Sequence, residues 1–154
     1  MSVGGDSDTR PTPWSPGPRR ATGETDPQDA FWEGFAAAEF GLFIGFGSPR
    51  AGKEAAAGKN FEEAVAYCEA LKAAGEIESV EYVLLAAPGG DLTGFFLLRG
   101  DPEKLGRLSM AAEFQRLITR ASVASDGVGV VNAVVDAGVM QRMAAWKEAI
   151  ADLI

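Results

Sequence analysis

Two apolar segments separated by a tight turn constrain the fold of this chain more than any other feature. Residues 80–87 and 92–99 read as strands, and residues 88–91 between them (Pro-Gly-Gly-Asp) are a strong hairpin signal. Both alternating sets of side chains are apolar in the middle of each strand, whereas an antiparallel hairpin with one face in water carries polar residues on that face. We therefore expect an antiparallel sheet that is covered on both sides.

A four-residue loop would place Ala87 opposite Leu92, which fixes the predicted register. Counting back from this pair puts Tyr82 and Arg99 on one face of the hairpin, where a phenol and a guanidinium suit an anionic or carbonyl ligand. Glu81 then lies on the opposite face among apolar side chains, where a buried carboxylate can act as a general base. The alternative for all three residues is a peripheral salt bridge or a solvated strand end.

The segment before the hairpin predicts one strand and one helix. Phe40, Leu42, Ile44 and Phe46 alternate with a second face that is mostly glycine, which indicates a strand. Residues 47–60 read as a loop. Asn60 with Glu63 three residues later reads as the cap of a helix that extends to Gly75.

The segment after the hairpin predicts a broken helix, a strand and a final helix. The Arg-Gly-Asp tripeptide at residues 99–101 is assigned a structural role, in which the strand ends and Asp101 caps a helix starting at Pro102. A shift in apolar phase near residues 109–112 predicts a kink in this helix, which runs to about residue 121. Residues 127–135 are expected to form the last strand. A final helix follows, with an apolar seam suited to packing on another helix or on a partner chain: Val139, Met143, Trp146, Ile150 and Leu153.

The N-terminal part differs in composition from the rest. Residues 1–28 are rich in proline, glycine, serine and threonine, which favours a disordered tail because little apolar surface is available to offset the ordering entropy. A short helix is expected from Asp26-Pro27 to about Ala38. Residues 29–154 are then expected to form a single α+β domain.

Charge and residue usage narrow the range of functions. The 154 residues include 14 basic and 22 acidic side chains, a net charge of -8 that disfavours nucleic acid and anionic membranes as partners. No apolar run reaches the length of a membrane span and the N-terminus shows no secretion signal, so a cytoplasmic protein is expected. The sequence contains no histidine, which excludes a Ser-His-Asp catalytic triad, a His-ligated zinc site and a His-ligated haem. Cys68 is the one cysteine and is expected to be a buried hydrophobe, and no metal or other cofactor is expected.

The order strand, helix, strand, strand, helix, strand predicts the split β-α-β, ferredoxin-like fold: a four-stranded antiparallel sheet with two helices on one face. The chain resembles the dimeric α+β barrel superfamily, and most closely its small bacterial members of unassigned function. The resemblance rests on this order of elements and on the sequence segments 61–71, 80–105, 113–121 and 127–135. This resemblance implies a homodimer in which two sheets meet, and a small, often apolar, ligand between sheet and helices. Some members are cofactor-independent monooxygenases.

Two further motifs suggest a binding site. Residues 47–53 match G-x-x-x-x-G-K after a strand, and Asp136 imitates a Walker B residue, but Glu54 follows where a P-loop needs a hydroxyl and the hairpin argues against a parallel sheet. Asn132 interrupts an apolar strand, so its amide either orients a ligand in a cavity or is a satisfied structural group at a strand edge or dimer seam.

Three functional hypotheses follow. The leading one is a homodimeric small-molecule-binding or accessory protein with an apolar cavity. The second is a cofactor-independent monooxygenase or isomerase that acts on an aromatic or polyketide-like substrate through Asn132, Tyr82 and Arg99. The third is a degenerate P-loop nucleotide binder.

Overall fold

The computed structural model describes residues 39–86 and 90–154. The predicted tail at 1–28, the predicted helix before Ala38 and the domain boundary at residue 29 lie outside the described residues, and they stay predictions.

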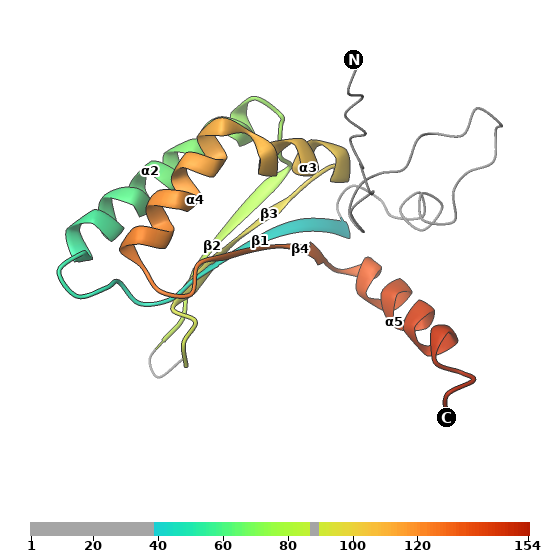
Figure 1. Cartoon of the computed structure of the whole chain (residues 1–154). Coiled ribbons are helices and arrows are strands. Elements are labelled where there is room, and N and C mark those ends of the chain that lie inside the picture. The colour runs from blue at the N-terminus through green and yellow to red at the C-terminus, as the bar shows by residue number, and fades with distance from the viewer. Residues whose placement is uncertain (1–38, 87–89) are drawn as a thin grey trace, which may run out of the picture. The chain divides into compact units, whose positions relative to one another are not determined.

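The described residues form one antiparallel sheet with three helices on one side (Figure 1). The strand order is β2-β3-β1-β4 and all three neighbouring pairs are antiparallel. The predicted α+β, split β-α-β arrangement is confirmed. Its elements are β1 (Phe40–Phe46), α2 (Glu54–Ala73), β2 (Ser79–Leu84), β3 (Gly94–Arg99), α3 (Pro102–Met110), α4 (Ala112–Ala124), β4 (Gly129–Val134) and α5 (Ala137–Ala149).

Local sequence signals determine the entry to α3 and the break after it. The Asp101 carboxylate accepts hydrogen bonds from the backbone N–H groups of Glu103 and Lys104, and Pro102 is the first helical residue, as predicted. Ala111 adopts an extended conformation with φ −65° and ψ 140°, which separates α3 from α4. The predicted kink is confirmed, and it lets the apolar stripes of both helices face the sheet.

Helix α2 begins seven residues earlier than predicted. The stretch 54–59 (Glu-Ala-Ala-Ala-Gly-Lys) is rich in strong helix formers, and a single glycine costs only about 1 kcal/mol in a helix. The helix therefore starts at Glu54, and the prediction that Asn60 is its cap is wrong. Asn60 instead lies inside the helix and is 7% exposed.

The register of the β2–β3 hairpin is shifted by one residue from the prediction. Tyr82 pairs with Phe96 and Glu81 pairs with Leu97, and the Leu85 N–H donates to the Thr93 carbonyl. This closes the hairpin around an odd number of residues rather than four. Since side chains alternate between the faces of a sheet, the shift moves every β2 side chain to the face opposite the predicted one.

One face of the sheet packs under α2, α3 and α4. Leu42 of β1 pairs with Leu98 of β3, and these two are the largest fully buried side chains in the described residues. Phe40, Phe96, Leu105, Leu108 and Phe114 complete the centre of this core. We call this side of the sheet the helix-covered face.

The other side of the sheet carries apolar side chains with no helix over them. This open face comprises Phe43, Val83, Phe95, Leu97, Val131 and Ala133, as the strand register requires. The Phe43 and Phe95 rings stack with centroids 5.1 Å apart. A Cβ at Gly45 would meet the Phe43 ring at 2.7 Å, and one at Gly41 would meet Leu97 at 3.0 Å. The glycines of β1 therefore let these side chains lie flat across the strand.

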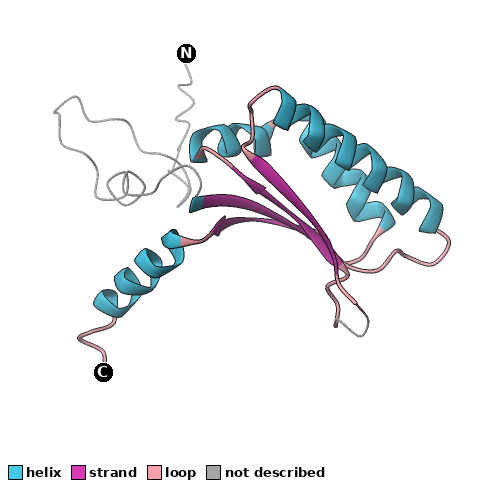
Figure 2. Cartoon of the chain, turned by 180° about the vertical axis from the view of Figure 1, so that it is seen from behind, coloured by secondary structure: helices cyan, strands magenta, loops and turns pink. Residues whose placement is uncertain are grey.

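Helix α5 leads away from the end of β4 and covers neither face (Figure 2). Its apolar side chains are exposed, Met140 to 72% and Trp146 to 53%. Of the predicted seam, Val139, Met143 and Trp146 lie on α5 and are exposed, whereas Ile150 and Leu153 lie beyond the end of the helix. The C-terminal segment of the same subunit does not seal the open face.

Candidate functional site

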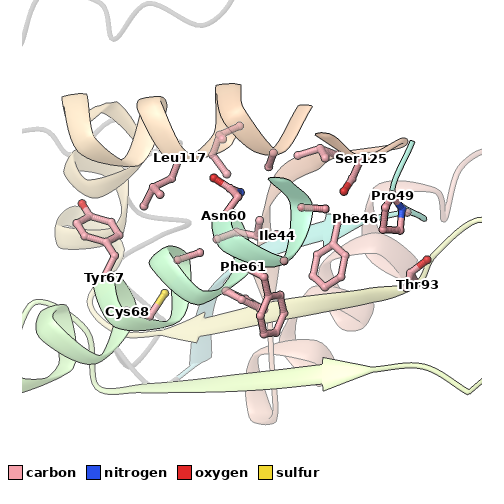
Figure 3. A pocket seen from close by; sticks show the side chains of 18 of the residues that line it. Ile44, Phe46, Pro49, Asn60, Phe61, Tyr67, Cys68, Thr93, Leu117 and Ser125 are labelled. Atoms are coloured by element: carbon pink, nitrogen blue, oxygen red, sulfur yellow. The ribbon is translucent and has the colours of Figure 1, made fainter. Parts of the chain in front are cut away.

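A cavity of about 310 Å³ lies between the helix-covered face and helices α2 and α4 (Figure 3). Ile44, Phe46, Phe96 and Leu98 line it from the sheet, and both helices contribute further side chains. The contributions of the helices include Phe61, Ala64, Cys68, Phe114, Leu117, Ile118 and Ala121. The lining also includes small residues of both helices, namely Ala57, Gly58, Ala64 and Ala121.

Three aromatic rings form one wall of this cavity. Phe61 and Phe96 meet edge to face with centroids 5.2 Å apart, and Phe46 is 6.0 Å from each of them. Such T-shaped contacts stabilise the rings in fixed positions. The wall is therefore pre-formed, apolar and suited to an aromatic or aliphatic guest.

Few polar groups reach the cavity. Glu54 is the only charged side chain among the described residues that line it, and it is exposed at the first turn of α2. Burial raises the pKa of the Cys68 thiol to about 11, and burial also raises the pKa of the Tyr67 phenol, with Glu113 adding to that effect. Both groups are therefore neutral near pH 7, and Cys68 is the inert buried hydrophobe that its place on the apolar stripe predicts.

Asn60 is the polar side chain that sequence reasoning missed as a site residue. It lines the cavity from α2, and its amide oxygen is buried with no hydrogen-bond partner in the described part of the chain. The one sequence pattern that includes Asn60, with Glu63 three residues later, was interpreted as a helix cap. The helical spacing of Asn60 with Ala64 and Cys68 on the inner face of α2 could have found it, had the helix start been predicted at Glu54.

The structure places Tyr82 and Arg99 on opposite faces of the sheet, which contradicts their predicted convergence. Tyr82 lies on the helix-covered face and donates a hydrogen bond of 2.8 Å to Glu69 of α2. Burial and this hydrogen bond raise the pKa of Tyr82. The cause of the error is the one-residue shift of the hairpin.

Arg99 and Glu81 share the open face, where they form a charged corner with Asp136. The Arg99 guanidinium lies 3.3 Å from the Glu81 carboxylate and also pairs with Asp136. The Glu81 side chain is 53% exposed, so it is not the buried carboxylate that the predicted register required. This arrangement matches the alternative interpretation of these residues, a salt bridge at the sheet periphery.

Asn132 does not reach the cavity. It pairs with Leu42 and so faces the helix side, but β4 is an edge strand and the Asn132 side chain is exposed. Of the two interpretations of Asn132, its place on an edge strand agrees with a structural group at a strand edge rather than with a side chain in the cavity. Ligand binding by Asn132, Tyr82, Arg99 or Glu81 stays a prediction, but the four do not form one site.

The G-x-x-x-x-G-K segment is engaged with the chain itself. The backbone N–H groups of Gly47 and Arg50 donate to the carbonyls of Asp126 and Ala124, at 2.7 and 2.9 Å. A P-loop instead directs such N–H groups at phosphates. Asp136 follows the end of β4 that pairs with Phe40, at the opposite end of β1 from this loop. The Walker B imitation is therefore a coincidence of sequence.

The described residues contain neither a candidate metal site nor a candidate membrane span. Within 39–86 and 90–154, no group of three or more histidine, cysteine, aspartate or glutamate side chains could hold a metal ion. None of the helices in that part of the chain is long and apolar enough to cross a membrane.

The fold agrees with that of solved structures. A dimeric ferredoxin-like protein of unknown function from Jannaschia sp. CCS1 matches 62% of this chain and 99% of its own, with 16% identity and a TM-score of 0.50. The chain has the ferredoxin-like fold. A dimeric protein of unknown function and ferredoxin-like fold from Bacteroides fragilis NCTC 9343 matches 65% of this chain and 100% of its own, with 16% identity and a TM-score of 0.47. The sequence matches no protein-family model and no curated protein.

Proposed function

We propose that this ferredoxin-like protein is a homodimer that binds a small apolar molecule in the cavity between its sheet and helices. The observation that carries the proposal is the cavity itself, about 310 Å³ of space behind an apolar, largely aromatic lining. Ligand pockets begin at about 300 Å³.

The size and lining of the cavity define the guest. Its volume is at the lower end of the range for ligand pockets, which suits a molecule of one or two rings or a short aliphatic chain. The edge-to-face arrangement of Phe46, Phe61 and Phe96 favours an aromatic guest, which can add a further ring to the cluster.

The open face supports the dimer. Phe43, Phe95 and Leu97 form a flat apolar surface on the central strands, and such a surface on a soluble subunit usually marks an interface. A second copy is the economical partner, because a two-fold axis matches the patch with itself. The similar protein from Jannaschia is described as dimeric, which agrees with this choice.

The proposal is for binding rather than catalysis. The enzymatic alternative relied on Asn132, Tyr82 and Arg99 acting together, and these side chains lie on an exposed edge and on opposite faces. Without convergent polar groups at the cavity, the arrangement favours a carrier or sensor of its guest.

Filling the cavity tests the binding proposal. Ala121→Phe puts a ring into the lining from α4, whereas Ala112→Phe adds the same ring at an exposed position of the same helix. We expect mono- and bicyclic aromatic compounds to bind the wild-type protein and Ala112→Phe in native mass spectrometry. Ala121→Phe should lose this binding while keeping its fold by circular dichroism. Absence of binding to the wild-type protein, or equal binding to both variants, would contradict the proposal.

A further inference from the structure

The amide of Asn60 is the one buried polar group of the cavity lining whose oxygen is left without a partner in the described residues. The residue is 7% exposed, and no hydrogen bond to its Oδ1 atom is formed within the described part of the chain. A buried acceptor without a donor is costly, and such groups in folded proteins are normally satisfied. An amide at this position therefore needs a donor from beyond the described residues.

The position of Asn60 gives a guest access to that oxygen. The side chain projects from α2 into the space between that helix and α4 (Figure 3). It lines the main cavity and also a second cavity of about 260 Å³ between α2 and α4, so it lies at the boundary of the two. A molecule in the main cavity thus meets the amide at the inner wall, on the side opposite the sheet.

The lining of the main cavity disfavours an ionised guest. Glu54 is the only charged group among the described residues of the main lining, and its negative charge at the first turn of α2 repels carboxylates and phosphates. No positive side chain in that lining offsets it, and the apolar surroundings disfavour any buried charge. The guest is therefore neutral.

We propose that Asn60 is the ligand-recognition residue of the cavity, and that the ligand is a neutral, mainly apolar molecule with one O–H or N–H donor, such as a phenol. The donor bonds to Asn60 Oδ1 while the apolar body packs on Phe46, Phe61 and Phe96. This inference rests on the proposed function, since it names the ligand class for the same cavity. It assigns specificity to a side chain that belongs to neither the hairpin nor β4.

A matched ligand pair tests the assignment. 1-Naphthol carries an O–H donor, and 1-methoxynaphthalene has the same rings with the donor blocked. We expect the wild-type protein to prefer 1-naphthol by about tenfold in dissociation constant, the effect of one hydrogen bond, in calorimetric titrations near neutral pH. Asn60→Leu, of similar size, should bind both compounds with about equal affinity. Ala121→Phe should bind neither.

The outcomes separate this inference from the proposed function. If the wild-type protein binds both compounds equally, or if Asn60→Leu keeps the preference, Asn60 is a structural amide and the inference is overturned while the binding proposal stands. If neither compound binds the wild-type protein, both are overturned. Asn60→Ser, which keeps an oxygen acceptor, should retain part of the preference. If Asn60→Leu fails to fold, the preference for 1-naphthol is compared between Asn60→Ser and Asn60→Ala instead.

Discussion

The two faces of the sheet are built from the same strands and from the same kinds of residue, but they have different surroundings. On β3, Leu98 points to the helix-covered face and is 0% exposed, whereas its neighbour Leu97 points to the open face and is only partly buried. On the edge strand β4, Val131 of the open face is 56% exposed. Apolar character alone therefore does not determine burial in this chain.

The difference shows what the two faces require. The helix-covered face obtains its partners from α2, α3 and α4 of the same subunit, and there the space that remains is the cavity. The open face has no partner in the described residues, because α5 leads away from β4. The first face is thus suited to enclosing a small molecule, and the second to meeting another protein surface.

The largest expected effect comes from truncating the helix-covered face. Leu98→Ala removes a fully buried side chain and leaves space behind it, so we expect the free energy of unfolding to fall by about 3–5 kcal/mol in urea denaturation. The loss should not depend on protein concentration, because Leu98 contacts its own subunit.

Leu97→Ala is the matched control on the next residue of the strand. We expect a loss of about 1 kcal/mol or less at low protein concentration, with a larger loss at high concentration, where the wild-type protein gains stability from its partner. Equal losses for Leu97→Ala and Leu98→Ala at every concentration would contradict the distinction between the faces.

The next effect concerns pH and the covered face. Burial raises the pKa of the Cys68 thiol from 9.0 to about 11. Between these values the unfolded thiol loses its proton while the folded one keeps it, so the unfolded state is favoured as pH rises through this window. We expect the free energy of unfolding to fall by on the order of 2 kcal/mol more in the wild-type protein than in Cys68→Ala between about pH 8 and about pH 11. Parallel pH profiles would show that water reaches Cys68 and that this part of the covered face is open.

The smallest effect concerns the charged corner of the open face. Asp136 has φ 52° and ψ −127°, a conformation that glycine adopts far more readily, and its carboxylate pairs with Arg99. Asp136→Gly and Asp136→Ala both lose the ion pair, but only glycine relieves the backbone. We therefore expect the free energy of unfolding in urea titrations to be about 1 kcal/mol higher for the glycine variant than for the alanine variant. A more stable alanine variant would contradict this reading of the backbone.

Much of the fold could be predicted because local signals and global topology agree. The alternation of Phe40, Leu42, Ile44 and Phe46 with a glycine-rich second face gave the strand and its orientation, and the Asp101-Pro102 cap gave the start of α3. The hairpin register could not be predicted, because the number of residues in the loop decides it and the turn residues at 88–91 fit more than one loop length. A shift of one residue was enough to separate Tyr82 from Arg99.

The candidate site was less predictable than the fold. Asn132 attracted attention because it interrupts an apolar run, but burial also depends on what lies over a strand, and β4 is at the edge. Asn60 was overlooked because Asn followed by Glu three residues later also fits a helix cap. The cavity is lined by residues from distant segments, such as Ala64 and Ala121, and no local sequence pattern shows that such residues come together.

The mass of the protein in solution tests the central claim, that a second copy covers the open face. Light scattering at micromolar concentration should give twice the chain mass of 16.1 kDa. Leu97→Lys should reduce this to the mass of one chain, whereas Met110→Lys, at a 78% exposed apolar residue of α3, should leave the doubled mass unchanged. A wild-type protein with the mass of one chain at high concentration, or a doubled mass that persists in Leu97→Lys, would contradict the account.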